Sequence, residues 1–267
     1  MNLSFFILNK DILCIFIISI YGEFVNILLS NDDGYKSLGL KALKNALGIY
    51  GKVTTVAPSR DISASSSCLS VHSPVKTLKI DNNFYKCYGT PADCVHIGSR
   101  GLMNKHPQIV FSGINFGSNM GDDVIYSGTV GAAIEGRHAE YGSYAISIAS
   151  KIPKYREDIA LKSEFVIKYI FDNLVKHKCI YNINIPDLPF SKIKGIKFTK
   201  LGKRKISCKA KKIINDNKVF FNIGGVGAGI NKMGSDFHAI NCRYISVTPI
   251  KIDMTDSITY ENLKNKL

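Results

Sequence analysis

The sequence lacks any Cys-x-x-Cys pair. Its seven cysteines are scattered along 267 residues and are odd in number. A zinc site of the usual kind needs cysteines at close spacing, and a disulfide framework needs them in pairs. The cysteine pattern therefore argues against both kinds of site, and a cytoplasmic location, where thiols stay reduced, is the simplest expectation.

The sequence also lacks an apolar run long enough to cross a membrane. The run at residues 12–21 has about ten residues, whereas a spanning helix needs roughly 20. No positive charge precedes this run at the extreme N-terminus, and no clear small-residue cleavage site follows it. A signal peptide is therefore the less favoured of two interpretations of this segment. We expect no membrane partner. We interpret residues 1–25 as a dispensable apolar extension, or as the product of an upstream start codon, ahead of a domain that begins near Asn26.

Acidic residues are scarce in one segment. The whole chain has 35 Lys and Arg residues against 21 Asp and Glu residues, a net charge of +14. Between Lys192 and Lys218 the single acidic residue is Asp216. Such a segment can steer anionic substrates or contact a nucleic-acid backbone. A solvated lysine-rich surface is the simpler interpretation, so we expect no stable nucleic-acid complex.

A Gly-x-Gly-x-x-Gly motif is absent too. The glycine-rich run at residues 224–229 has a different spacing and opens no clear helix, so it does not indicate dinucleotide binding. The sequence shows no internal repeats. These absences leave an ordinary globular chain, which is long enough to bury a full hydrophobic core without disulfide bonds or a structural metal ion.

The apolar patterns that are present predict an α/β fold with a mainly parallel sheet. A strand ending at Ser30, a helix over 38–47 and a strand over 52–58 form a βαβ unit. We expect residues 26–190 to form the catalytic core and residues 191–267 to form a C-terminal basic hairpin and oligomerisation segment. Further strands are predicted at 108–111, 144–149, 181–186, 195–201, 218–223 and 243–249, and further helices at 127–141, 155–177 and 255–267.

Asn31, Asp32, Asp33 and Gly34 follow the first strand. They should lie at the carboxyl edge of the sheet, where α/β proteins bind ligands. Two adjacent carboxylates repel each other, and a hard cation such as Mg²⁺ or Mn²⁺ offsets that cost. The alternative is a plain turn, because these residue types favour turns for local reasons.

Later loops bring more candidate ligands to the same edge. The serine-rich loop 59–70 follows the second strand, and the segment 112–123 follows the third. Ser127-Gly128-Thr129 opens a helix, whose free N–H groups suit a phosphate. Thr90 and Asp93 fit a capping box, so Asp93 is expected to be structural. The possible metal or phosphate ligands within 112–123 are Asn115, Asn119, Asp122 and Asp123.

Five motifs, taken in order, resemble those of the SurE family of survival proteins. They are Ser30-Asn31-Asp32-Asp33-Gly34, Ala57-Pro58 with Ser63-Ala64-Ser65, Gly89-Thr90-Pro91-Ala92-Asp93-Cys94-Val95, Ser112-Gly113-Ile114-Asn115 with Gly117, Asn119, Gly121 and Asp122, and Tyr126-Ser127-Gly128-Thr129-Val130. Asn184-Ile185-Pro186, Gly234-Ser235-Asp236-Phe237 and Val247-Thr248-Pro249 also resemble that family. The resemblance covers about residues 26–249, and the combination of motifs is highly specific.

The resemblance implies a Rossmann-like three-layer sandwich and a phosphatase that depends on a divalent metal cation. It implies nucleoside monophosphates as substrates, cleaved at the 5′ or 3′ position, and a β-rich C-terminal part that exchanges elements in a homodimer or homotetramer. Two features depart from the family pattern: residues 1–25 have no counterpart, and Phe116 stands where a smaller or polar residue is usual. The metal ligands implied by motif position are Asp32, Asp33, Ser63 and Asn115.

The residue chemistry agrees with a 5′-nucleotidase, a phosphoric monoester hydrolase. Asp32 and Asp33 are the expected catalytic residues, since they would hold a cation that polarises the phosphoryl group. Exopolyphosphatase activity is a further expectation. Two alternatives stay open: a basic nucleic-acid-binding protein, and a nucleotide-sensing protein without turnover. The residues expected to bind phosphate or the rest of the substrate are Asn31, Asn115, Asn119, Ser127, Gly128 and Thr129.

Overall fold

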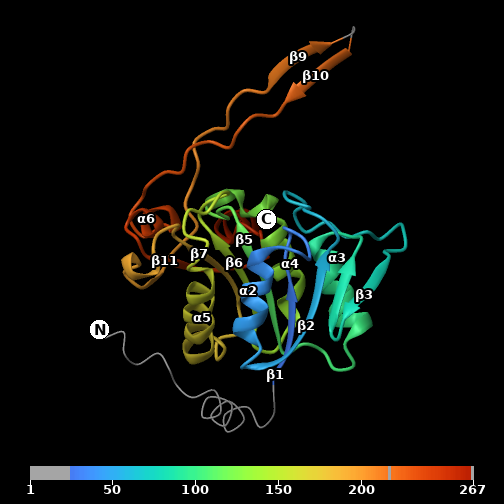
Figure 1. Ribbon diagram of the computed structural model, residues 1–267. Helices are drawn as coiled ribbons and strands as arrows, with labels where there is room; N and C mark the ends of the chain where they lie inside the picture. Colours follow the sequence, from blue (N-terminus) through green and yellow to red (C-terminus); the bar gives the residue numbers. More distant parts are fainter. Residues whose placement is uncertain (1–24, 216–217, 266–267) are drawn as a thin grey trace.

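A mainly parallel sheet forms the centre of the protein (Figure 1). The computed structural model describes residues 25–215 and 218–265, and within them the sheet has nine strands in the order β3-β4-β2-β1-β5-β6-β7-β11-β8. The prediction for residues 1–24 lies outside the described residues. The strands of the sheet are β1 (Val25–Ser30), β2 (Gly51–Pro58), β3 (Thr77–Asp81), β4 (Phe84–Cys87), β5 (Ile109–Phe116), β6 (Ser143–Ile148), β7 (Ile180–Ile185), β8 (Ile196–Phe198) and β11 (Ile245–Ile250).

The six strands from β4 to β7 in the sheet order run parallel, whereas β3 and β11 pair antiparallel with β4 and β7. β1 lies between β2 and β5 and is buried on both faces. Its Ile27 and Leu29 pack into one core cluster, and Leu28 packs into another on the opposite face. This burial explains its almost continuous apolar run, which is typical of a central parallel strand.

Helices cover both faces of the sheet. α2 packs against α5 on one face and α3 packs against α4 on the other, which confirms the predicted α/β fold with flanking helices. Within the described residues, no helix is both long and apolar enough to cross a membrane. The helices are α2 (Leu38–Leu47), α3 (Pro91–Ile97), α4 (Gly128–Glu135), α5 (Ile159–Tyr169), α6 (Asp236–Asn241) and α7 (Ser257–Lys264), with shorter turns η2 (Gly98–Leu102), η3 (Gly121–Tyr126), η4 (Gly136–His138), η5 (Ile170–Leu174) and η6 (Phe190–Lys192).

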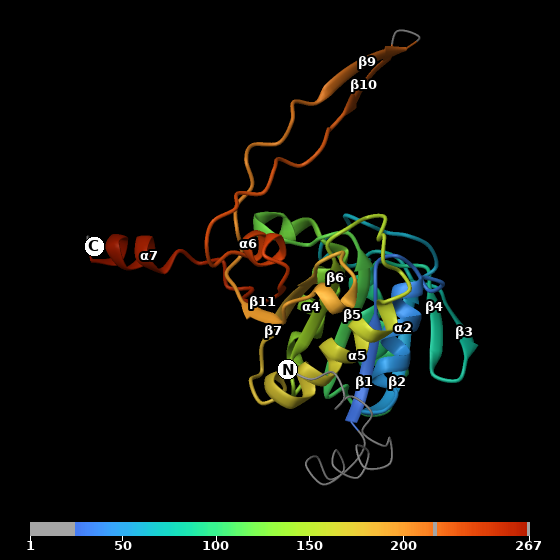
Figure 2. The same ribbon diagram turned by 60° about the vertical axis from the view of Figure 1, so that its left-hand side comes forward.

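The C-terminal part contributes two strands to the central sheet and also forms a separate hairpin. β8 and β11 extend the core sheet, while β9 (Lys211–Asn215) and β10 (Lys218–Asn222) form a separate antiparallel hairpin that projects from the body (Figure 1). Figure 2 shows that α7 also lies away from the sheet. The division of the chain near residue 190 therefore stays a prediction, because strands from both sides of it share one sheet.

Several elements differ from the sequence prediction. The third strand was expected over 108–111, but β5 continues to Phe116 because Ser112 and Asn115 are buried and pair with β6. The hairpin β3–β4 was not predicted, although β4 is half-buried and ends in the fully buried Cys87, because its strands have only five and four residues. α4 ends at Glu135, short of residue 141, because Gly136 follows it.

Candidate metal and phosphate site

Asp32 and Asp33 lie directly after β1, at the carboxyl edge of the sheet. Asp32 is only 3% exposed, and its Oδ1 and Oδ2 accept hydrogen bonds from Thr129 Oγ1 (2.7 Å) and Thr129 N (3.1 Å). Asp33 Oδ2 accepts a hydrogen bond from Phe116 N at 3.2 Å. The acid pair is therefore fixed between the end of β5 and the first turn of α4.

Burial changes the acidity of this pair. It raises the pKa of Asp32, and it raises the pKa of Asp33 to about 7, with the neighbouring Asp32 charge adding to the effect. The Asp61 carboxylate raises both pKa values further. Carboxylates crowded in this way favour either a proton or a cation in their midst.

Asp61 is a member of the site that the sequence analysis missed. Its loop reaches the acid pair through a backbone hydrogen bond from Ile62 N to Asp32 O at 2.9 Å. Asp61 Oδ1 also accepts hydrogen bonds from Ser63 Oγ (2.6 Å) and Ser63 N (2.8 Å). Ser63 is thus held beside the third carboxylate, on the loop that touches the acid pair.

Asn115 lies near the end of β5, one residue before the amide that binds Asp33. It is 7% exposed, and its Nδ2 donates to Gly117 O at 2.7 Å, which leaves the amide oxygen for a ligand. The structure therefore brings together the three segments that carry the predicted metal ligands.

The donor set suits a hard divalent cation. Carboxylate, hydroxyl and amide oxygens are the ligands that Mg²⁺ and Mn²⁺ prefer. Among the described residues, no group of three or more His, Cys, Asp or Glu side chains could hold a metal ion by itself. A cation at this edge therefore needs the neutral oxygens of Ser63 and Asn115 as well as the two aspartates.

The turn that opens α4 is tied to the acid pair. Ser127 Oγ accepts a hydrogen bond from Val130 N (3.1 Å) as the N-cap, and the Thr129 side chain binds Asp32. A Cβ on Gly128 would lie 3.0 Å from Asp32 Cβ and 2.8 Å from Ser65 Oγ, so this close approach requires glycine. The N–H groups of Thr129 and Val130 and the Thr129 hydroxyl are thus already used within the described residues, so a phosphate contact from this turn would use the Gly128 N–H and the Ser127 O–H.

Asn31 and Asn119 each hold a loop in place. Asn31 Nδ2 donates to Gly34 O (3.0 Å) and to Ser37 Oγ (2.9 Å), which fixes the turn before α2. Asn119 Nδ2 donates to Ser147 Oγ (2.8 Å), and the Asn119 backbone N–H and C=O pair with the Asn184 side chain (2.9 and 2.8 Å). These contacts give both residues a structural role, and a phosphate contact from either stays a prediction.

Asp122 and Asp123 belong to a different contact. Arg204 N donates to Asp122 Oδ1 at 3.1 Å, and the Arg204 guanidinium pairs with Asp123. The two carboxylates therefore hold the base of the projecting hairpin, and a role for either as a metal or phosphate ligand stays a prediction.

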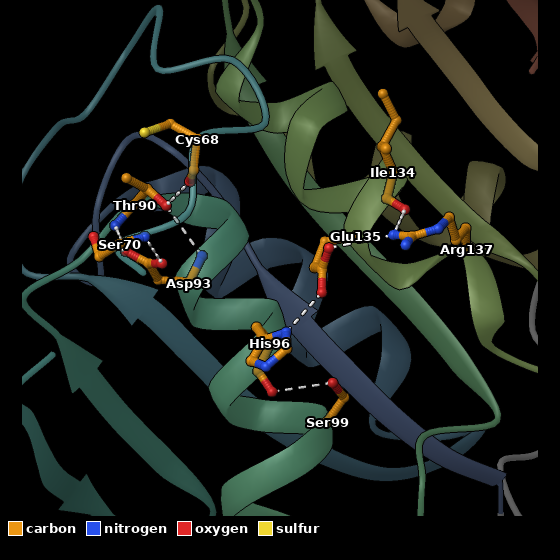
Figure 3. Close-up of polar contacts among 9 residues, drawn as sticks. All are labelled: Cys68, Ser70, Thr90, Asp93, His96, Ser99, Ile134, Glu135 and Arg137. Atoms are coloured by element: carbon orange, nitrogen blue, oxygen red, sulfur yellow. Dashed lines mark hydrogen bonds and ion pairs between the residues drawn. The ribbon is translucent and has the colours of Figure 1, made fainter. Parts of the chain in front are cut away.

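Asp93 is structural, as its spacing predicts (Figure 3). It forms a capping box with Thr90 and accepts two further hydrogen bonds from Ser70, through Ser70 N (2.8 Å) and Ser70 Oγ (2.7 Å). Burial alone would raise the pKa of Asp93, but these hydrogen bonds outweigh it and lower the pKa. On the same helix, His96 Nδ1 lies 2.8 Å from Glu135 Oε1, which joins α3 to the end of α4.

The family model described as "Survival protein SurE" matches residues 27–208, more than half of the chain. The chain belongs to the SurE family. A protein of Histophilus somni named "5′-nucleotidase SurE" is 44% identical over 234 residues, covering 86% of this chain and 94% of that protein. A protein of Wigglesworthia glossinidia brevipalpis named "5′/3′-nucleotidase SurE" is 43% identical over 245 residues, covering 90% of this chain and 97% of that protein.

A solved SurE structure shares the fold. The crystal structure of the SurE protein from Aquifex aeolicus is similar with a TM-score of 0.78 and 39% sequence identity, covering 90% of this chain and 98% of that one. The resemblance seen in the motifs is therefore confirmed at the level of family and fold.

Asp33→Asn is expected to stabilise the metal-free protein at pH 8 and to have a smaller effect near pH 5. The folded-state pKa of Asp33 is about 7 against 3.8 for a free carboxyl, so folding favours its protonated form. Stability therefore falls as pH rises from about 4 to about 7, and the uncharged amide removes this loss. After allowance for partial solvent screening we expect a gain of about 1 kcal/mol.

The measurement is urea unfolding in EDTA at pH 5 and pH 8. Asp81→Asn, on the exposed strand β3, is the matched control and should leave the pH dependence unchanged. If Asp33→Asn lowered the free energy of unfolding by the same amount at both pH values, the charge on this carboxylate would not destabilise the folded protein.

Proposed function

We propose that this chain is a 5′-nucleotidase that hydrolyses the phosphate ester of nucleoside monophosphates and depends on one divalent cation. The names of its SurE relatives support the activity, and one of those names supports 3′-nucleotides as additional substrates. The structural observation that carries the proposal is the acid pair of the buried Asp32 and the half-buried Asp33, held between β5 and α4 with raised pKa values.

Each part of the site has a stated role in this proposal. The residues that would hold the cation are Asp32, Asp33, Ser63 and Asn115. Bound there, Mg²⁺ or Mn²⁺ supplies positive charge that stabilises negative charge developing on the phosphoryl oxygens. Thr129 keeps the Asp32 carboxylate in one orientation. The Gly128 N–H, the Ser127 hydroxyl and the dipole at the start of α4 bind phosphate oxygens, and Asp33 orients the attacking water.

The test is phosphate release from a panel of nucleoside 5′- and 3′-monophosphates and short polyphosphate. We expect turnover with Mg²⁺ or Mn²⁺, a loss of roughly 100-fold or more in EDTA, and recovery when the metal is restored. Turnover that survives EDTA would contradict the metal role. The absence of turnover with any substrate or metal would contradict the enzyme.

The same experiment separates the alternatives. A nucleic-acid-binding protein that uses the basic segment 192–218 would bind RNA in EDTA, with an affinity that falls steeply as salt rises. A nucleotide-sensing protein would bind nucleoside monophosphates without releasing phosphate. All six cysteines within the described residues are free, which agrees with the predicted cytoplasmic location without deciding it.

We also propose a homodimer or homotetramer that forms through the projecting C-terminal hairpin. Both strands of this hairpin carry large apolar side chains in solvent, and Phe221 is 61% exposed. Exposed apolar side chains on both faces of a projecting hairpin are typical of a segment that packs against another chain. The apolar residues exposed on the hairpin are Ile213, Ile214, Val219, Phe220 and Phe221.

Replacing Phe220 and Phe221 together with serine is expected to shift the protein to a smaller assembly, measured by light scattering after gel filtration. Loss of two buried aromatic contacts at each interface should weaken association by several kcal/mol, roughly 100-fold or more in the dissociation constant. Lys211→Ser with Lys212→Ser, on the paired strand β9, is the control. An unchanged mass for the phenylalanine variant would exclude the hairpin as the interface.

A further inference from the structure

A pocket of about 650 Å³ lies beside the acid pair. It opens where β2 and β4 end, and its lining includes Arg60 and Ile62 from the loop after β2 and Lys86 and Tyr88 from the end of β4. None of these residues takes part in the metal and phosphate site described above. The pocket is large enough to take a substantial part of a nucleotide.

One short loop separates the pocket from the acid pair. Ile62 N bonds to Asp32 O at 2.9 Å, and a Cβ on Gly34 would lie 2.9 Å from the carbonyl carbon of Arg60. Between them, Asp61 acts electrostatically on both aspartates of the pair. On this loop, Asp61 therefore acts on the acid pair, whereas Arg60 lines the pocket.

The free charge of the pocket is positive. The Arg60 guanidinium is exposed and forms no hydrogen bond or ion pair with another described residue. The Lys86 ammonium lies 5.1 Å from the ring centre of Tyr88 and 5.2 Å from that of Tyr35. Lys76 lies 5.4 Å from the Tyr88 ring as well. These rings hold lysines on their faces, so the pocket presents cations rather than bare aromatic surface.

The hydroxyl groups on the opposite wall are already occupied. Ser70 Oγ donates to Asp93 Oδ2 at 2.7 Å, and Thr90 Oγ1 donates to the Cys68 carbonyl oxygen at 2.6 Å (Figure 3). The Asp93 carboxylate keeps its charge, but it is 5% exposed and forms no ion pair with Arg60 or Lys86. The two cations are therefore left to recognise a ligand.

The spacing of the strands gives the distance between the pocket and the acid pair. β4, β2 and β1 are consecutive in the sheet, and adjacent strands lie about 4.8 Å apart, so the end of β4 lies about 10 Å from the end of β1. A nucleoside that carries phosphates on both its 5′ and 3′ oxygens can bridge this span.

We infer that the Arg60–Lys86 pocket binds a second phosphate group of the substrate, so that the site favours nucleoside 3′,5′-bisphosphates over monophosphates. This inference rests on the proposed nucleotidase. The reaction is the same hydrolysis: water adds to one phosphorus, its P–O bond to the ribose breaks, and the ribose oxygen takes a proton. The second phosphate stays on the nucleoside and serves for binding, through charge-assisted hydrogen bonds to Arg60 and Lys86.

The test compares kcat/KM for a nucleoside 3′,5′-bisphosphate and its 5′-monophosphate in the wild type and in the variant Arg60→Gln/Lys86→Gln. The ratio of the two values should fall by roughly tenfold or more in this variant, mainly through KM for the bisphosphate. The control is Lys52→Gln/Arg100→Gln, which also removes one lysine and one arginine charge. Lys52 lies at the start of β2 and Arg100 in η2, and neither lines this pocket. The control should keep the wild-type ratio.

Binding in EDTA supplies a second measurement that does not depend on turnover. Equilibrium dialysis should show tighter binding of the bisphosphate than of the monophosphate, and the Arg60→Gln/Lys86→Gln variant should lose this preference. An unchanged ratio and unchanged preference would overturn the inference. Equal losses for both ligands would also overturn it, since the pocket would then serve the base or ribose. A wild type that binds with this preference but releases no phosphate would refute the nucleotidase and leave the pocket assignment standing.

Discussion

Asp32→Asn is expected to lower metal-stimulated phosphate release by at least about 10²- to 10³-fold. The substitution removes one of the two charges that would hold the cation. The amide can keep both present contacts, because its oxygen can accept from Thr129 N while its NH₂ group donates to Thr129 Oγ1, whose hydroxyl then acts as the acceptor. At a position that is 3% exposed the substitution therefore changes the charge and leaves the orientation of the side chain largely intact.

The measurement is steady-state phosphate release over a range of Mg²⁺ and Mn²⁺ concentrations, with circular dichroism to confirm that the variant is folded. The loss should appear in kcat and in the metal concentration needed for half-maximal rate. Asp81→Asn on β3 again serves as the control. An Asp32→Asn enzyme that retains wild-type rates would remove Asp32 from the site.

Asp236→Ala is expected to destabilise the protein by about 3 to 5 kcal/mol. Asp236 is 0% exposed, and its carboxylate accepts hydrogen bonds from the backbone N–H groups of Gly121 (2.7 Å), Gly202 (2.9 Å) and Phe237 (2.8 Å). Alanine would leave these three donors without an acceptor in the interior. The contacts join α6 to η3 and to the base of the hairpin, so the loss falls on three segments at once.

Urea unfolding of the metal-free protein measures this effect. Asp236→Asn should fall between the wild type and alanine, because its amide oxygen can still accept while its NH₂ group faces a donor. The exposed Asp253→Ala, near the C-terminus, should change stability by less than about 0.5 kcal/mol. A loss below about 1 kcal/mol for Asp236→Ala would show that other groups or water satisfy the three N–H donors.

The sequence predicts the parts of the fold and site that follow from local pattern. β1, α2 and β2 emerge from apolar periodicity and from the glycine that follows the helix, and the position of Asp32 follows from the end of β1. The Thr90–Asp93 capping box is equally local, because both partners lie within one helical turn.

The rest depends on how distant segments meet. Asp61 reaches the acid pair only because its loop folds back through the Ile62–Asp32 hydrogen bond, which no spacing in the sequence reveals. Asp122 and Asp123 resemble ligands in the sequence, but Arg204, about 80 residues later, engages both. α6 is too short for a periodic signal, although Ser235 caps it by accepting a hydrogen bond from His238 N.

The contact at Gly128 limits how this sequence can diverge. A single methyl group there would stand 2.8 Å from Ser65 Oγ and 3.0 Å from Asp32 Cβ, closer than a side chain can settle. With alanine at 128, Ser65 would have to turn its hydroxyl away and the first turn of α4 would have to shift by a few tenths of an ångström from Asp32. Because that shift moves the groups that orient Asp32, substitutions at this position are expected to be selected against for as long as the activity is maintained.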